Sequence, residues 1–242
     1  MNICVAQTRP VRGDIKSNII NHKKLIDLAI SNEADIIIFP ELSLTGYEPT
    51  LAKDLATNEN DHRFDDFQRI SDGKNIIIGA GVPTKNENGL CISMILFLPH
   101  KPRQVYSKKY LYPDEEAFFI SGQNFACLKV NNINIAPAIC YEISVPEHSE
   151  NAFKNGAEIY IASVAKTANG VERAFKTLSD IASKYSMMVL MSNSVGMCED
   201  GLCSGTTSVW NSKGALLKQL DDISEGILIF DTETQEVIEK TT

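Results

Sequence analysis

Short apolar runs rich in isoleucine and valine recur along the chain, and polar stretches separate them. Continuous apolar runs of this length are typical of strands that are buried on both faces of a sheet. They predict strands at residues 2–6, 35–39, 75–80, 91–98, 134–140, 158–163, 187–192, 206–210 and 226–230. The runs within residues 89–107 also have the spacing of a hairpin.

Helical patterns lie between several of these strands. Over residues 14–31 the apolar positions recur with a helical period, and Asp14 can cap the first turn. The positions on one face of this helix are Ile15, Ile19, His22, Ile26 and Ala29. A second helix is predicted over residues 171–185. The alternation indicates a layered α/β fold with mixed sheets. No linker-like stretch or repeat divides the chain, so a single domain over residues 1–242 is expected.

Length and charge exclude several classes of protein. A chain of 242 residues can bury roughly 70–75% of the surface that its unfolded form exposes, so its core needs no covalent or metal support. The net charge is −8 and no basic stripe is present, which argues against a nucleic-acid partner. The longest apolar runs, at 36–40 and 94–99, are far shorter than the roughly 20 residues that span a bilayer, so no membrane partner is expected.

The cysteines and histidines form no recognisable metal or redox motif. The six cysteines are scattered, without a C-x-x-C pair or a preceding secretory segment, which predicts a reduced, cytoplasmic protein. The four histidines form no H-E-x-x-H pattern, and neither a G-x-S-x-G elbow nor a P-loop occurs. The turn QTRPVRGD after the first strand lacks the glycine fingerprint of a dinucleotide-binding domain. We therefore expect neither a metal nor a cofactor.

Three reactive or charged side chains follow apolar runs, where a strand end can hold them at the mouth of a pocket. They are Glu41, Lys108 and Cys140. Each has a plain structural explanation, because a lone cysteine behaves as a small hydrophobe and because single glutamates and lysines are commonly solvated. Their joint occurrence favours a chemical role. A pair of Cys140 with His148 is an alternative nucleophile and base.

Together these side chains could carry acyl transfer. A thiol is mostly protonated at neutral pH, so attack by Cys140 needs a base, which Glu41 can supply. The tetrahedral intermediate carries a negative oxygen, which the Lys108 ammonium and the backbone N–H of Tyr141 could stabilise. Glu41, once protonated, could give its proton to a departing amine.

Three stretches resemble the motifs of one family. FPELSLTGY resembles the glutamate motif of the nitrilase superfamily of carbon–nitrogen hydrolases, YSKKYLYPDEEAFFISG its lysine motif, and ICYEISVPE its cysteine motif, in the family's order. The resemblance implies a four-layer α-β-β-α sandwich with mixed β-sheets. It also implies a catalytic triad of Glu41, Lys108 and Cys140.

The lysine motif also distinguishes between adjacent candidate residues. Its pattern selects Lys108, and in an extended segment Lys109 should point to the opposite face. The spacing back from Gly122 places the family's second glutamate at Glu115 rather than Glu116. The resemblance implies that Glu115 orients the lysine or the substrate amide.

Departures from the family pattern bear on the substrate. Members that act on ω-amides of keto acids have an arginine four residues after the cysteine, suited to bind a carboxylate, and here that position is Ser144. This departure implies neutral or small aliphatic amides, with Ser144 and Glu142 as candidate substrate-binding residues. Glu142 is alternatively a structural carboxylate. Lys166 is the one candidate to restore the missing charge, unless it is a solvated loop lysine. Tyr141 stands where nitrilases usually carry tryptophan, which favours amides over nitriles.

The resemblance therefore implies a cysteine-dependent amidase that releases ammonia from a small molecule through a thioester. An N-carbamoyl amine hydrolase, an ω-amidase and an acyltransferase are alternatives within the enzymes. A catalytically silent binding scaffold is the alternative outside them. Members of the family assemble through the helix that follows the cysteine, here about residues 146–155, so a homodimer or a higher homo-oligomer is expected.

Overall fold

Two large sheets form the centre of the molecule in the computed structural model, which describes residues 1–123 and 127–242. In this described part the first sheet has seven strands, in the order β15-β14-β1-β2-β3-β4-β5. These are Asn2–Gln7 (β1), Ile36–Ile38 (β2), Ile77–Asn86 (β3), Gly89–Phe97 (β4), Gln104–Ser107 (β5), Gly226–Asp231 (β14) and Val237–Thr241 (β15). Strands β1, β2 and β3 run parallel, and the others pair antiparallel.

The second sheet has six strands among the described residues, in the order β13-β12-β9-β8-β7-β6. They are Leu128–Val130 (β6), Ile133–Ile139 (β7), Ile159–Val164 (β8), Met188–Asn193 (β9), Ser208–Trp210 (β12) and Leu216–Gln219 (β13). Its central strands β7, β8 and β9 are parallel. A separate hairpin pairs Val195–Cys198 (β10) with Gly201–Ser204 (β11).

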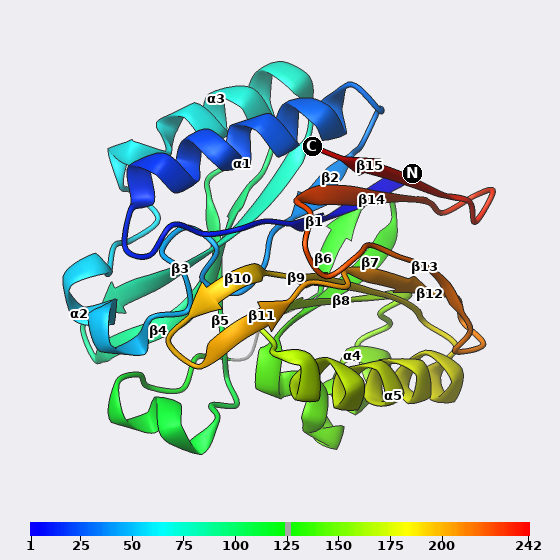
Figure 1. Cartoon of the computed structure of the whole chain (residues 1–242). Helices are drawn as coiled ribbons and strands as arrows, with labels where there is room; N and C mark the ends of the chain where they lie inside the picture. The colour runs from blue at the N-terminus through cyan, green and yellow to red at the C-terminus, as the bar shows by residue number, and fades with distance from the viewer. Residues whose placement is uncertain (124–126) are drawn as a thin grey trace.

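Helices cover the outer faces of both sheets (Figure 1). The helices are Ile15–Ile30 (α1), Ala52–Leu55 (α2), Asp65–Lys74 (α3), Pro146–Lys154 (α4) and Ala168–Tyr185 (α5). Short 3-10 turns occur at Pro49–Leu51 (η1), His62–Phe64 (η2), Pro113–Ala117 (η3) and Cys140–Ser144 (η4). In Figure 1, α1 and α3 lie on one side of the molecule and α4 and α5 on the other, with the sheets between them.

Three apolar clusters match these layers. Val5 and Ile38 of the first sheet pack in one cluster with Ile139 and Ile161 of the second. The other two clusters join each sheet to its helices, for example Phe39 to the α1 side and Trp210 to the α5 side. The expected α-β-β-α sandwich with mixed sheets is therefore confirmed, and burial of these faces is its main stabilising contribution.

The first helix follows the predicted pattern closely. It begins after Asp14, whose side chain accepts a hydrogen bond from the Ser17 N–H at 3.0 Å. The predicted apolar face, Ile15 to Ala29, is the buried face. The later helix begins at Ala168, three residues before the predicted start, because its first residues, Ala168 to Gly170, carry no large apolar side chain.

Elements that bury few side chains were not predicted. Strands β13 and β15 are almost entirely exposed at sheet edges, and α3 buries only Phe67 and Ser71. The hairpin β10–β11 was also missed. Within residues 1–123 and 127–242 the structure contains no helix that is both long and apolar enough to cross a membrane.

Candidate active site

The segment that carries Glu41 leaves β2 and lies directly on β3. The Leu44 N–H donates to the Gly81 carbonyl at 2.9 Å, and Leu42 has a left-handed φ of 49°. A Cβ at Gly81 would lie 2.4 Å from the Leu42 nitrogen and 2.5 Å from the Pro40 oxygen. Only glycine therefore lets the two backbones approach this closely, and this contact fixes the position of Glu41.

Lys108 follows β5 and is fully buried. Its N–H donates to the Ile92 carbonyl at 2.8 Å, and its carbonyl accepts from the Gly122 N–H at 2.8 Å. A Cβ at Gly122 would lie 2.3 Å from the Ser107 oxygen. Only glycine at position 122 therefore lets this segment lie so close to the backbone of Ser107. These contacts hold the Lys108 side chain inside the molecule.

The buried Lys108 ammonium joins two carboxylates. Its Nζ donates to Glu41 Oε1 at 2.9 Å and to Glu115 Oε1 at 2.7 Å. Glu116 is exposed, whereas Glu115 is buried and contacts Lys108. Burial acts to lower the pKa of Lys108, but the charges of Glu41, Cys140 and Glu115 outweigh it and raise that pKa above its ordinary value. Lys108 is therefore a permanent cation here.

Glu115 is held by two further donors. The Tyr47 hydroxyl donates to Glu115 Oε1 at 2.9 Å, and the Tyr112 N–H donates to Oε2 at 2.7 Å. Tyr47 was not singled out from the sequence, although it closes the FPELSLTGY motif. Its place in that motif was the available signal.

Cys140 stands where β7 ends and η4 begins. Its φ of 45° is left-handed, an uncommon conformation for a residue with a side chain, so the chain turns sharply at the thiol. Burial, together with the charge of Glu41, raises the pKa of Cys140 to about 11, and the ammonium groups of Lys166 and Lys108 oppose that shift. The thiol is therefore protonated at neutral pH and needs a base to react.

Glu41 is the carboxylate best placed to be that base. Burial raises its pKa, the Lys108 charge lowers it, and the Glu115 charge raises it again. The Cys140 thiol also acts on this carboxyl group and lowers its pKa. Glu41 Oε2 is buried and has no hydrogen-bond partner of ordinary geometry among the residues that the structure describes. A buried carboxylate oxygen with free acceptor capacity beside a thiol can take up a proton.

Glu142 connects the lysine segment to the cysteine strand. Its Oε2 accepts from the Ile139 N–H at 2.8 Å and from the Tyr106 hydroxyl, and its Oε1 accepts from the Lys109 N–H at 2.7 Å. Both oxygens of this fully buried carboxylate are thus occupied by protein donors. The contacts are those of a structural carboxylate.

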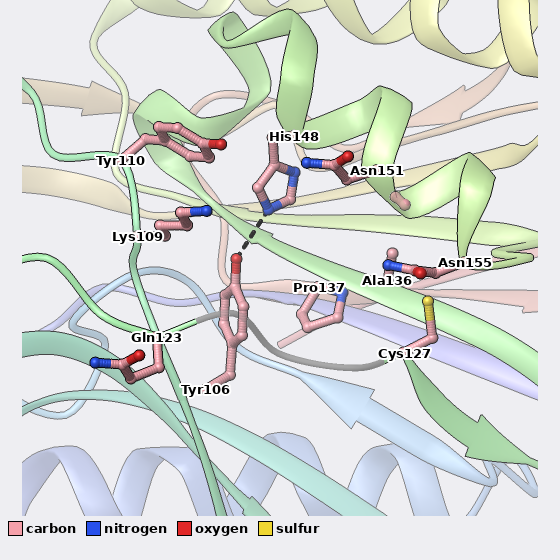
Figure 2. A pocket seen from close by; sticks show the side chains of 11 residues that line it. Tyr106, Lys109, Tyr110, Gln123, Cys127, Ala136, Pro137, His148, Asn151 and Asn155 are labelled. Atoms are coloured by element: carbon pink, nitrogen blue, oxygen red, sulfur yellow. Dashed lines mark hydrogen bonds between the residues drawn. The ribbon is translucent and has the colours of Figure 1, made fainter.

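His148 does not form the alternative pair with Cys140. Its Nδ1 lies 2.8 Å from the Tyr160 hydroxyl and its Nε2 lies 3.0 Å from the Tyr106 hydroxyl, the contact drawn as a dashed line in Figure 2. Burial is the main cause that lowers the pKa of His148. Because both ring nitrogens are occupied by tyrosines, the Cys140–His148 alternative is not supported.

A cavity of about 280 Å³ lies beside this histidine and is lined by Tyr106, Lys109 and His148, among others (Figure 2). Lys109 faces this cavity, while Lys108 points into the buried carboxylate cluster. The two lysines therefore serve opposite sides of the segment, as expected. Glu41, Lys108 and Cys140 do not line this cavity.

The remaining sequence candidates differ in position. Ser144 is exposed at the end of η4, and Tyr141 directly follows the cysteine in that turn. Lys166 is half-buried in the loop after β8, the parallel neighbour of β7. The Asn193 side chain accepts from the Lys166 N–H at 2.8 Å and donates to its carbonyl at 3.2 Å. The Lys166 backbone is therefore held next to the end of β7, where Cys140 lies, and its side chain is only partly exposed.

Comparisons with known proteins identify several relatives of this chain. The glutamine-dependent NAD(+) synthetase of Aquifex aeolicus is 27% identical over 237 residues, 94% of this chain and 41% of that protein. The 2-oxoglutaramate amidase of Bacillus subtilis is 22% identical over 216 residues, 86% of this chain and 82% of that protein. The chain spans only about two fifths of the length of the NAD(+) synthetases that it matches, 41–42%.

A solved structure shares the whole fold. The amidase from Nesterenkonia sp. AN1, in a mutant form with acrylamide added at its active-site cysteine, gives a TM-score of 0.88 at 20% identity, over 97% of this chain and 94% of that one. The model of the family described as carbon-nitrogen hydrolase matches residues 2–240. The chain therefore belongs to the carbon–nitrogen hydrolase family.

Proposed function

We propose that this protein is an amidase that uses Cys140 to hydrolyse a linear amide of a small molecule and releases ammonia. The observation that carries the proposal is the buried cluster in which Lys108 Nζ contacts Glu41 at 2.9 Å and Glu115 at 2.7 Å beside the Cys140 thiol. Burying three charged groups together is costly for folding, so such a cluster favours a functional role. No metal or cofactor takes part in the proposed reaction.

In the first half of the reaction, the Cys140 sulfur attacks the amide carbonyl while Glu41 accepts the thiol proton. The carbonyl oxygen becomes negative, and the Lys108 ammonium and the Tyr141 N–H stabilise it. The carbon–nitrogen bond then breaks, Glu41 gives its proton to the leaving nitrogen, and ammonia departs. A thioester remains on Cys140.

In the second half, Glu41 removes a proton from water as the water attacks the thioester carbonyl. The carbon–sulfur bond breaks, the acid product leaves, and the proton returns to the Cys140 sulfur. Glu115 positions Lys108 throughout, and Glu142 keeps the lysine segment joined to the end of β7. In this mechanism Glu142 does not bind the substrate.

The decisive test is ammonia release from a panel of simple aliphatic amides, ω-amides of dicarboxylic acids, glutamine and N-carbamoyl amines. We expect at least one linear amide to give ammonia and the matching acid in equal amounts. Carbon dioxide appearing with ammonia would favour the N-carbamoyl hydrolase, and transfer to an added amine the acyltransferase. If no probe reacts and no probe labels Cys140, the protein is a catalytically silent binding scaffold rather than an amidase.

The raised pKa of Glu41 predicts the acid limb of the pH profile. Protonated Glu41 cannot take the thiol proton, so activity is lost as pH falls through its pKa in the folded protein. Because burial raises that pKa, the midpoint of this loss in kcat/KM is expected above 4.5, the ordinary glutamate value. The residual activity of Glu41→Gln should lack this limb. A wild-type midpoint at or below 4.5 would contradict the assignment of Glu41.

A second candidate is an ω-amidase, and the position of Lys166 favours it. A half-buried ammonium that acts on the pKa of Cys140 could also bind the carboxylate of an ω-amide. The relative from Bacillus subtilis is named for such a substrate, 2-oxoglutaramate. Ser144, in contrast, offers no charge for a carboxylate.

Replacing Lys166 with methionine distinguishes these candidates. A hydrogen bond to a charged group contributes about 1.5–3 kcal/mol, so an ω-amidase should lose roughly ten- to hundredfold in kcat/KM for carboxylate-bearing amides. Neutral amides of equal length should lose much less. The matched control is Lys109→Met, whose side chain faces the cavity beside His148, and this change should leave the ratio of the two substrates unchanged. An unchanged ratio in Lys166→Met would reject the ω-amidase.

Two further expectations remain proposals. The protein is proposed to be cytoplasmic, and to form a homodimer or a higher homo-oligomer through α4. Phe153 on this helix has 49% of its surface exposed and packs beside Tyr185 of α5, which gives an apolar contact for a partner. Light scattering should give a dimer for the wild type and a monomer for Phe153→Glu. A monomeric wild type at micromolar concentration would contradict the dimer.

A further inference from the structure

The β10–β11 hairpin carries two cysteines that the proposed reaction does not use. Cys198 ends β10 and Cys203 lies within β11, and the Cys203 thiol donates to the Cys198 sulfur at 3.4 Å. Cys198 is paired with Gly201 and Cys203 with Gly196, so the two cysteines are diagonal neighbours on one face of the hairpin. Both are free thiols.

This hairpin forms part of the wall around the candidate active site. The Glu199 N–H at its tip donates to the Tyr47 carbonyl at 3.1 Å, and the Ser204 N–H donates to the Lys166 carbonyl at 2.9 Å. The hydrogen bond to Cys198 and burial raise the pKa of Cys203 most, and the charges of Cys140 and Glu41 add to this shift. The thiol pair therefore lies next to the nucleophile without belonging to the triad.

The two thiols differ in accessibility and in acidity. Cys203 is 2% exposed, whereas Cys198 is half-buried. The hydrogen bond from Cys203 lowers the pKa of Cys198, while the pKa of Cys140 is raised to about 11. Reactivity toward oxidants follows thiolate content and access. Cys198 and Cys140 are both half-buried, so access does not separate them. Cys198 has the lower pKa and a second thiol 3.4 Å away that can close a disulfide, so it should react before Cys140.

We propose that Cys198 and Cys203 form a redox-active dithiol that peroxides oxidise to a disulfide while Cys140 stays reduced. The Cys198 thiolate attacks a peroxide oxygen, the O–O bond breaks, and a sulfenic acid forms at Cys198. The Cys203 sulfur then attacks the Cys198 sulfur, the S–O bond breaks, and water leaves with the Cys203 proton. With hydrogen peroxide, the dithiol loses two electrons and two protons, and one peroxide becomes two waters.

The local structure allows this closure. The sulfurs must approach from 3.4 Å to a bond length of about 2.05 Å, which needs a small movement. The hairpin is a separate two-stranded sheet, and its sulfurs line a cavity of about 10 Å³ together with Tyr47. A small thiol reductant would reopen the disulfide by exchange.

Peptide mass spectrometry after brief treatment with substoichiometric hydrogen peroxide tests the proposal. Trypsin leaves Cys198 and Cys203 together in residues 185–213 and Cys140 alone in residues 130–154, each without another cysteine. We expect the first peptide to lose two hydrogens at least about tenfold faster than the second gains oxygen. Dithiothreitol should reverse the change. These readouts need no turnover, so they are independent of the proposed function.

Variants separate the pair from the other thiols. In Cys203→Ser the disulfide cannot form, and Cys198 should instead accumulate as a sulfenic acid that dimedone traps. Cys198→Ser should leave Cys203 reduced, since Cys203 is buried and peroxide does not reach its thiol. Cys127→Ser should behave as wild type. Earlier oxidation of Cys140, or absence of the disulfide in the wild type, would overturn the proposal.

Discussion

Replacing Cys140 with alanine is expected to lower ammonia release from the best amide substrate by a factor on the order of 10⁴ or more. The change removes the sulfur that would form the thioester. Alanine keeps the Cβ and the same left-handed backbone at φ 45°, so the local fold should not change. Ammonia assays measure the loss. Acid-quenched mass spectra during turnover should show an acyl adduct on wild-type Cys140 only.

The matched control for this variant is Cys127→Ala. Cys127 is a half-exposed thiol outside the buried cluster, and its loss should change activity by less than about twofold. If Cys140→Ala kept more than about one hundredth of the wild-type rate, the thiol could not be the nucleophile. The adduct would then be sought on another residue.

Replacing Lys108 with methionine should have two large effects. Activity should fall by roughly 10²–10³-fold, because the developing oxyanion loses a charged donor. The free energy of unfolding should fall by about 3–5 kcal/mol, because Glu41 and Glu115 would remain buried without their cation. Urea unfolding and steady-state kinetics of the same sample measure both quantities.

A double variant separates these two effects. Lys108→Met with Glu115→Gln removes one of the two orphaned carboxylate charges, so part of the lost stability should return. Activity should not return, since the donor to the oxyanion is still missing. Recovery of activity together with stability would mean that Lys108 only supports the fold. The single variant Glu115→Gln shows how much of the change in stability and activity comes from the glutamate substitution alone.

Much of the fold could be predicted because its central strands are apolar along their whole length. Strands such as β1 and β8 lie between a helix layer and a second sheet, so both of their faces are buried and the sequence shows it. Strand β15 at the sheet edge is almost fully exposed, and hydropathy gives no sign of it. Strands were missed where backbone hydrogen bonds to a neighbouring strand, rather than burial of side chains, stabilise them.

The candidate site was predictable for a different reason. Glu41, Lys108 and Cys140 are far apart in sequence, but their joint occurrence after apolar runs, together with the three family motifs, indicated that they meet. The contacts that hold these three residues could not be predicted from the sequence. They depend on the close approach of two backbones, as at Gly81, or on a carboxylate that binds a distant segment, as with Glu142. The position of Lys166 was likewise open, since Asn193 on the next strand determines it.

The left-handed backbone at Cys140 also bears on how this protein could change over evolutionary time. A side chain in that conformation costs roughly 1–2 kcal/mol relative to the right-handed region, whereas glycine adopts it freely. Selection for the thiol therefore works against local backbone preference at this position. In a lineage that no longer needed the reaction, mutation to glycine or asparagine would relieve the strain. A homologue with glycine at this position would be recognisable as a former enzyme that kept the sandwich for another use.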